Sequence, residues 1–187
     1  MPNKIQVAIA VLFLHCTPQA YATDDVTKSS LLEMRKEDQD ALKDKSLSDA
    51  QTGDIFKRHT AKLKAMVHTH GWPKISEVGE EASQGAWLLV QHADDDRSWQ
   101  QEALKLMEPL VAQGEIKGSD VAYLKDRLSV AEHQPQPYGT QGQCGSSGTW
   151  QPFAIEDPAG VDQRRLAMKM QTLQDYIDMA TKYMCKK

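Results

Sequence analysis

Residues 54–73 read DIFKRHTAKLKAMVHTHGWP, and the spacing of their larger side chains decides the fold class. The residues that share one face at steps of three and four are Phe56, His59, Leu63, Met66 and His70. Such spacing is typical of an α-helix, whereas a half-buried strand alternates at every second residue. Gly71 ends the helix, and Trp72-Pro73 prevents its continuation. We therefore predict a helix over residues 49–70.

The same periodicity extends in both directions, and the alternation expected of strands is nearly absent. We expect further helices over residues 27–43, 79–94, 98–113 and 119–132. The charge density of the first of these indicates a partly solvated N-terminal helical arm over residues 23–48. A final helix begins after Asp157-Pro158, which is a good cap and first-turn pair. Its expected core stripe consists of Leu166, Met170, Leu173, Ile177 and Met184.

The segment before this final helix comprises 25 residues, 133–157, and is rich in Gln, Gly, Pro and Ser. Loops of that length are uncommon in compact domains and are usually functional or disordered. Its aromatic residues Tyr138, Trp150 and Phe153 favour docking against the helices. The sequence therefore predicts an all-α protein. We expect a single compact helical domain over residues 49–187, with about five to six helices and one long Gly/Gln/Pro-rich loop.

The first 22 residues have the layout of a secretory signal peptide. Lys4 supplies the positive end, residues 5–16 are mostly apolar, and small residues precede a cleavage site after Ala22. An apolar run of about a dozen residues is shorter than the ~20 that a bilayer-spanning helix needs. A lipoprotein signal through Cys16 is disfavoured by the neighbouring His15. We expect a periplasmic or secreted protein without stable membrane insertion after signal cleavage.

The cleaved chain would keep two cysteines, Cys144 and Cys185. In an oxidising compartment they can form one disulfide, worth roughly 2–4 kcal/mol for a loop of about 40 residues. The alternative is two free thiols.

The charge balance bears on the class of partner. Against 26 acidic residues stand 22 basic ones, or 21 once Lys4 is removed with the signal peptide. This balance argues against a nucleic-acid partner, which would need a basic face to neutralise phosphates.

The sequence WLLVQHADDD, residues 87–96, holds the strongest candidate for chemistry. One helical stripe contains Glu81, Gly85, Leu88 and His92, and Gly85 predicts the close approach of another segment. Asp96, one turn further on, could orient the His92 imidazole for acid–base chemistry. Alternatively, Asp95 or Asp96 caps the next helix, with Ser98 and Gln101 as a capping box. Asp94 near a helix C-terminus is unfavourable for the helix dipole, so it needs an explanation.

Other polar residues have competing explanations. His70 lies at a helix C-terminus, where the dipole favours a cation. Asp126 and Arg127 form either a structural ion pair or part of a site. Arg165, near a helix N-terminus, either offsets nearby acids or binds an anion. The sequence lacks the H-E-x-x-H and C-x-x-C spacings, a Gly-rich phosphate loop and a nucleophile elbow. We therefore expect neither a metal nor a cofactor.

Four stretches occur together in a characteristic order: HGWPKISEVGEEASQGAWLLVQHADDD (70–96), AYLKDR (122–127), PQPYGTQ (135–141) and IEDPAGVDQRR (155–165). This order resembles a family of mostly bacterial helical domains of uncharacterised function. Its members carry the motifs H-G-W-P, Q-H-A-D, Y-L-x-D-R, Y-G-T-Q and E-D-P-x-x-V-D-x-R-R. The resemblance spans about residues 54–176 and departs from the pattern at the Gln/Gly/Ser insertion around Cys144, which would suit an exported member stabilised by a disulfide.

The resemblance implies a set of polar pattern residues but no activity. The set consists of His70, Trp72, Glu81, His92, Asp94, Asp126, Arg127, Gln136, Tyr138, Gln141, Asp157 and Arg165. A family pattern that consists largely of polar and charged residues suggests a polar pocket. We place it between the helices over residues 79–94 and 119–132 and the final helix, under the Tyr138 loop.

Two functions follow from these predictions. One is a histidine-based hydrolase of a small anionic or sugar-like substrate. In this enzyme His92 would be the acid/base and His70 a second acid/base, with Asp94 or Asp96 as the residue that orients His92. The substrate-binding residues would be Arg127, Tyr138, Gln141, Arg165 and Glu81, with Arg127 or Arg165 as the anion clamp. The alternative is a non-catalytic periplasmic binding, inhibitor or toxin-neutralising protein. The partner is then a small molecule or another protein.

Overall fold

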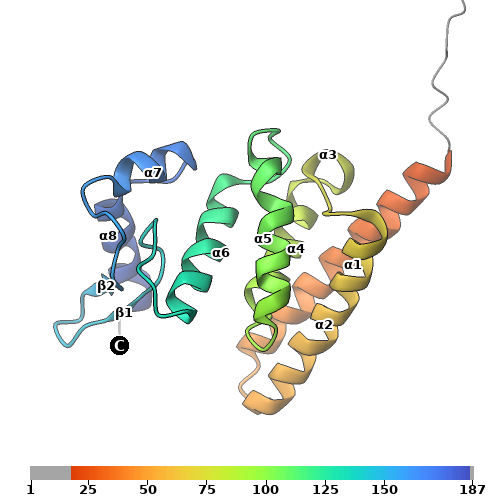
Figure 1. Cartoon of the computed structure of the whole chain (residues 1–187). Coiled ribbons are helices and arrows are strands. Elements are labelled where there is room, and N and C mark those ends of the chain that lie inside the picture. Colours follow the sequence, from red (N-terminus) through yellow and green to blue (C-terminus); the bar gives the residue numbers. More distant parts are fainter. Residues whose placement is uncertain (1–17, 186–187) are drawn as a thin grey trace, which may run out of the picture.

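The computed structural model describes the backbone of residues 18–185 and the side chains of residues 24–185 (Figure 1). Its helices are α1 (Pro18–Lys43), α2 (Asp49–His70), α3 (Ile75–Val78), α4 (Glu80–Gln91), α5 (Arg97–Val111), α6 (Gly118–Ala131), α7 (Val161–Ala167) and α8 (Leu173–Met184). One small antiparallel hairpin joins β1 (Gly142–Cys144) to β2 (Trp150–Pro152). The predicted all-α class is confirmed.

The predicted signal peptide lies largely outside the described residues. Of its 22 residues the structure describes only the backbone of residues 18–22, which begins α1. None of the described helices is both long and apolar enough to cross a membrane.

Helix α2 begins and ends where its sequence predicts. The Ser48 side chain accepts a hydrogen bond from the Gln51 backbone amide, and the Gln51 side chain accepts one from the Ser48 amide. This reciprocal capping box satisfies amide groups that a helix start otherwise leaves without partners. Gly71, at φ +81°, ends the helix in a conformation that glycine adopts readily. Local chemistry therefore defines both ends of α2.

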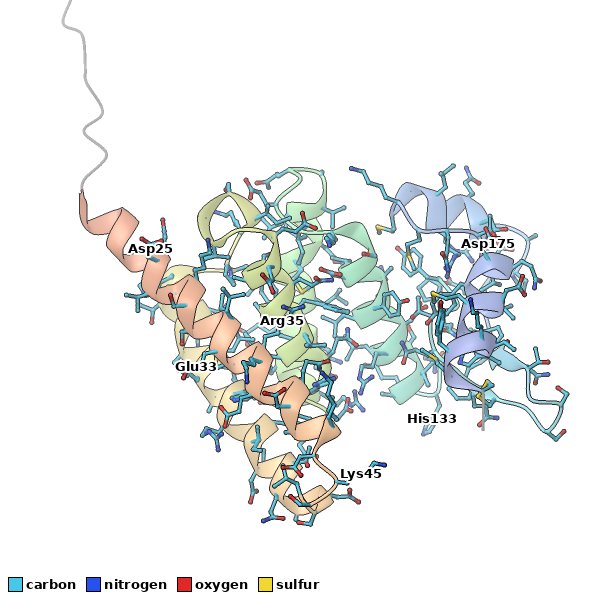
Figure 2. All side chains as sticks on the ribbon, turned by 180° about the vertical axis from the view of Figure 1, so that it is seen from behind. Asp25, Glu33, Arg35, Lys45, His133 and Asp175 are labelled. Atoms are coloured by element: carbon cyan, nitrogen blue, oxygen red, sulfur yellow. A yellow bond between two sulfur atoms is a disulfide. The ribbon has the colours of Figure 1, made fainter. Side chains whose placement is uncertain are left out.

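Helix α1 contributes one face to the core, while many of its other residues are exposed. It packs mainly against α4, and its Leu31 and Met34 are buried in the main core. Gly85 of α4 makes this contact possible, because a Cβ atom there would lie 3.3 Å from the Arg35 Cβ. Arg35 reaches from α1 to Glu81 of α4 (Figure 2). The close approach predicted from Gly85 is thus confirmed.

The molecule contains two apolar clusters. The larger lies among α1 to α6 and includes Leu63, Leu89, Trp99, Met107 and Leu124. The smaller consists of Trp150, Tyr176 and Ala180, with Tyr123 of α6 packed against it. In Figure 1 the hairpin, α7 and α8 lie on one side of α6, away from α1 and α2. Helix α6 therefore joins the two clusters.

The predicted final helix is wrong, because the chain breaks it into α7 and α8. Lys169 turns the chain at φ +55°, and the Arg165 Nε donates a hydrogen bond to the Gln171 carbonyl within this turn. Leu166 and Met184, which were expected in the core, are 74% and 60% exposed. The buried residues are instead Val161, Arg165, Tyr176 and Ala180.

The long loop over residues 133–157 is more ordered than predicted. It contains the β1–β2 hairpin, with Gln143 paired to Gln151. Tyr138 and Trp150 are buried, as the docking prediction requires, whereas Phe153 is 38% exposed. The predicted disulfide is present between Cys144 and Cys185, so it joins β1 to the end of α8.

Candidate functional site

One candidate site is a cavity of about 990 Å³ between α2 and the segment that joins α4 to α5. We call it the His92 pocket. Helix α2 contributes Gly53, Phe56, Lys57, Thr60, Ala61, Lys64, Ala65 and His68, and the rest of the lining comprises Leu42, Arg127 and residues 92–96. A cavity of this size can hold a small-molecule ligand. It does not lie where the sequence placed it, between α4, α6 and the final helix.

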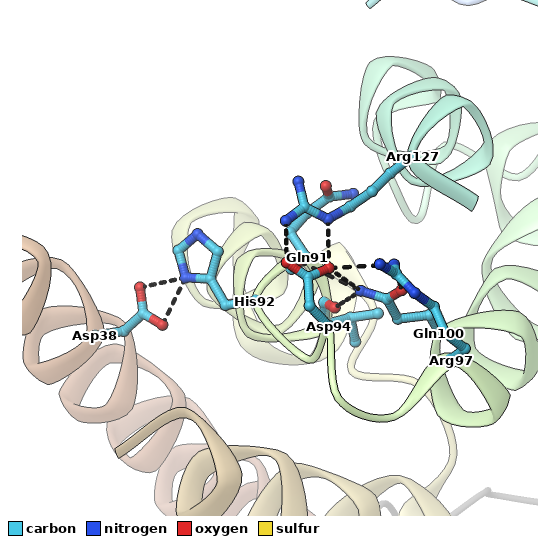
Figure 3. A network of polar contacts seen from close by, with 8 residues as sticks. Asp38, Gln91, His92, Asp94, Arg97, Gln100 and Arg127 are labelled. Carbon is cyan, nitrogen blue, oxygen red and sulfur yellow. Dashed lines mark hydrogen bonds and ion pairs between the residues drawn. The ribbon is translucent and has the colours of Figure 1, made fainter. Parts of the chain in front are cut away.

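His92 ends α4 and faces a carboxylate from α1. Its Nδ1 lies 2.8 and 2.9 Å from the two oxygens of Asp38, which is fully buried (Figure 3). An ionised carboxylate only accepts hydrogen bonds, so Nδ1 is the donor to Asp38, and in the neutral form of the imidazole Nε2 is then the acceptor. Within the described chain Nε2 has no hydrogen-bond partner, and the Phe56 ring packs 4.9 Å from the imidazole. The orienting residue is therefore Asp38 rather than Asp94 or Asp96.

Asp94 serves as a tether between helices. Arg127 of α6 donates two hydrogen bonds to the Asp94 carboxylate, one from Nε at 2.9 Å and one from Nη2 (Figure 3). Burial alone would raise the pKa of Asp94, but the hydrogen bond and charge of Arg127, with smaller effects of Arg97 and Gln100, hold that pKa below its usual value. These partners explain an anion near the end of α4, and the catalytic role predicted for Asp94 has no support here.

The next two aspartates face α2. Asp95 pairs with Lys57 at 3.2 Å, and Asp96 pairs with Lys64 at 2.8 Å. Asp96 also accepts a hydrogen bond from the Trp99 amide at 3.0 Å, so it is the N-cap of α5. The capping alternative is therefore correct for Asp96. Because each cation of the pocket has its own aspartate, the pocket offers no uncompensated positive charge.

His70 does not share the site with His92. It lines a different cavity of about 330 Å³, next to Asp24, Met66 and Glu77. The two histidines therefore line different cavities, and the structure does not bring them together in one site. Glu81, predicted to bind substrate, pairs with Arg35 at 2.5 Å and lines neither cavity.

Tyr138, Gln141 and Arg165 are also absent from the lining of the His92 pocket. The buried Asp126 carboxylate accepts hydrogen bonds from the amides of Tyr138, at 2.9 Å, and Thr140, at 2.7 Å. The buried Arg165 Nη1 donates to the Tyr138 carbonyl at 2.7 Å. Gln141 is held in the same way, because its amide donates to the Gln136 side chain. These contacts satisfy the backbone of a buried loop, and the structure does not bring the loop or Arg165 to the His92 pocket.

The comparisons with known proteins place the chain in a family. A family model described as a family of unknown function, DUF6624, matches residues 29–186. The chain belongs to DUF6624. The match contains every residue that lines the His92 pocket as well as the Tyr138 loop. No curated protein and no solved structure matches the chain.

The DUF6624 match also contains the residue that sequence reasoning missed, Asp38. A signal for it was available. Leu31, Met34, Asp38 and Ala41 follow one another at helical steps of three, four and three, and all four are buried. A lone carboxylate on the buried stripe of a helix needs a partner. The sequence does not show which residue that partner is, because His92 lies 54 positions away.

Metal binding has no geometric support in the described part of the chain. Among residues 24–185, no group of three or more His, Cys, Asp or Glu side chains is placed to hold an ion. The His92 pocket contains an imidazole held by a carboxylate, three cations paired with aspartates, and apolar side chains such as Phe56.

Proposed function

We propose that the protein is a hydrolase in which His92 acts as the general base and Asp38 is its positioning residue. One observation carries this proposal. The buried Asp38 carboxylate holds Nδ1 of His92, which leaves Nε2 as a proton acceptor at the edge of a cavity large enough for a substrate. Histidine suits this role because it exchanges protons near neutral pH.

The reaction would be hydrolysis of an ester. Nε2 takes a proton from a water molecule while the water oxygen bonds to the carbonyl carbon. The bond between that carbon and the leaving oxygen then breaks, and the proton passes from the imidazolium to the leaving oxygen. Asp38 stabilises the imidazolium between these transfers. The pairing of Lys57, Lys64 and Arg127 with aspartates favours a neutral ester over the anionic substrate that the sequence suggested.

The proposal is tested with p-nitrophenyl acetate and p-nitrophenyl decanoate. We expect His92→Gln to lower kcat/KM by about 100-fold or more, since a positioned general base typically contributes that much. Glu81→Gln is the matched control, because Glu81 is polar and exposed but lies outside the pocket. Equal rates for the wild type and His92→Gln on both esters would exclude the hydrolase.

The test of Asp38 must distinguish an effect on the orientation of His92 from an effect on folding. We expect Asp38→Asn to lower kcat by roughly 100-fold or more with KM little changed, because the tautomer with a free Nε2 is no longer favoured. The ring ¹⁵N shifts of His92 should report that change directly. A folded Asp38→Asn variant with the wild-type tautomer and kcat would remove Asp38 from the mechanism.

The second candidate is a non-catalytic binding protein. It is favoured by the lining of the His92 pocket, which in the described chain includes neither serine nor cysteine as a nucleophile. Ester binding that is equally tight in the wild type and in His92→Gln, without hydrolysis by either, would support this candidate.

Export forms part of the same proposal. The Cys144–Cys185 disulfide supports it, because disulfides persist mainly in oxidising compartments. Expression in a Gram-negative host followed by mass spectrometry of the periplasmic fraction should give a chain that begins after Ala22. A full-length chain confined to the cytoplasm would contradict export.

A further inference from the structure

Thr60 is a buried threonine inside α2 whose hydroxyl takes part in none of the contacts described so far. A hydroxyl in the middle of a helix can donate to the carbonyl four residues earlier or point into solvent. Thr69 of the same helix does the first, because its hydroxyl donates to the Ala65 carbonyl at 2.8 Å. Thr60 does neither. It is only 7% exposed, and no hydrogen bond joins its hydroxyl to another residue in the described part of the chain.

Thr60 lines the His92 pocket, and its place along α2 shows which part of the cavity it faces. Phe56, four residues earlier, packs against the His92 ring, and Lys64, four residues later, pairs with Asp96 at 2.8 Å. Residues four apart lie on the same face of a helix, separated by about 6 Å along its axis. Thr60 therefore faces the segment between α4 and α5, about one helical turn from the contact with the imidazole.

The charged donors of the pocket lining are already bonded to acids. The pairs are Lys57–Asp95, Lys64–Asp96, Arg127–Asp94 and His68–Glu102. An acid beside a donor opposes the negative charge that grows on a carbonyl oxygen during ester hydrolysis. The Thr60 hydroxyl is bonded to no acid. It is therefore the side-chain donor of the lining that is free to turn toward a substrate carbonyl.

We infer that the Thr60 hydroxyl donates a hydrogen bond to the carbonyl oxygen of the ester while His92 activates the attacking water. The inference rests on the proposed function and adds a specificity-determining residue to it. A molecule of similar shape without that carbonyl oxygen would leave the hydroxyl without a partner and would bind less well.

The contribution of Thr60 to the reaction is electrostatic. As the water oxygen bonds to the carbonyl carbon, the carbonyl oxygen gains negative charge, and the hydrogen bond from the hydroxyl becomes stronger. When the bond to the leaving oxygen breaks, the C=O double bond forms again. Thr60 keeps its proton throughout. A donor that binds the transition state more strongly than the ground state raises the rate.

The test is Thr60→Val, which replaces the hydroxyl by a methyl group of similar size. We expect kcat/KM for p-nitrophenyl acetate to fall by about 100-fold, the loss typical of removing one donor to a developing oxyanion. Thr60→Ser keeps the hydroxyl and should recover most of that loss. Thr69→Val is the matched control, because it makes the same exchange on an exposed part of α2 outside the His92 pocket.

Three results would overturn the inference. The first is a Thr60→Val variant as active as wild type. The second is a Thr60→Ser variant as inactive as Thr60→Val, since the hydroxyl would then not be the group that matters. The third is an acetyl group trapped on Thr60 during turnover and detected by mass spectrometry, because the hydroxyl would then be a nucleophile instead of a hydrogen-bond donor.

A binding measurement separates this inference from the proposed function. Benzylacetone offers a carbonyl oxygen but has no leaving oxygen, so its binding requires no catalysis. Calorimetric titration compares His92→Gln with the double variant His92→Gln/Thr60→Val. Binding that is about threefold or more weaker in the double variant, as expected for one neutral hydrogen bond, supports the Thr60 contact even if no ester is hydrolysed. His92-dependent hydrolysis that Thr60→Val leaves unchanged would preserve the hydrolase and overturn the inference.

Discussion

Three aspartates, Asp38, Asp120 and Asp126, are buried, and their hydrogen-bond partners differ. Asp38 orients His92, and Asp126 fixes the amides of Tyr138 and Thr140. Asp120, at the start of α6, is held much less firmly. Its carboxylate accepts one side-chain hydrogen bond, from the Ser119 hydroxyl at 3.5 Å. Burial raises the pKa of Asp120 to about 7, and the Lys117 charge opposes this only in part.

This raised pKa predicts that Asp120 lowers the free energy of unfolding by an amount that depends on pH. Well below pH 3.8 the carboxyl is protonated in both the folded and the unfolded protein, so it does not affect stability. Between the ordinary pKa of 3.8 and about 7 only the unfolded state ionises, so stability falls as the pH rises. At pH 8 Asp120→Asn should therefore raise the free energy of unfolding, by at most about 4 kcal/mol at 1.36 kcal/mol per pKa unit.

Urea unfolding at pH 4 and pH 8 measures this effect. The two proteins should differ little at pH 4. Asp25→Asn, which removes the same charge from an exposed position, is the control. A variant that is no more stable than wild type at pH 8 would contradict the assignment.

At the scale of elements, two helical glycines should respond in opposite ways to alanine. Gly53→Ala should stabilise the protein by about 1 kcal/mol, because alanine has a higher helix propensity than glycine and its Cβ atom would meet no other atom within 4 Å. Gly85→Ala should destabilise it by about 1 kcal/mol, because overpacking against Arg35 and Leu31 of α1 exceeds the gain in propensity. Thermal unfolding of both variants checks the pair. Stabilisation by both would mean that α1 yields easily at Gly85.

The elements that the sequence predicts well are those whose ends are set by neighbouring residues. Helix α2 is an example, because Ser48, Gln51 and Gly71 act within one turn of its ends. The break between α7 and α8 could not be predicted in this way. It depends on Arg165, whose guanidinium binds the Gln171 and Tyr138 carbonyls. The second of these lies 27 residues away, and helical periodicity contains no information about it.

The candidate site was predictable only in part for the same reason. His92 was identified because a histidine on an apolar stripe needs an explanation. Its partner was assigned to Asp94 or Asp96, which are near in sequence, whereas the partner is Asp38 on another helix. The polar motif residues around Tyr138 suggested a pocket, but they hold the backbone of a loop. A polar residue type alone does not distinguish a ligand contact from a backbone contact.

At the scale of the whole molecule, the two apolar clusters predict unequal stability. The C-terminal cluster is small and is closed by the Cys144–Cys185 disulfide, whose cysteines lie 41 residues apart. Replacing both cysteines with serine should cost about 2–4 kcal/mol in this part. Hydrogen exchange should then accelerate in the hairpin and α8, with α2, α4 and α5 nearly unchanged. Uniform acceleration throughout would show that the two clusters unfold as one unit.

The arrangement of α6 between these clusters has a practical consequence. The hairpin, α7 and α8 lie across α6 from α1 and α2 (Figure 1). None of them contributes a residue to the lining of the His92 pocket. A dye, bead or sensor surface attached to exposed residues of α8, such as Lys182, would leave the entrance of the His92 pocket unobstructed. Immobilised protein should therefore retain ligand access, which suits it to surface-based screening of candidate esters.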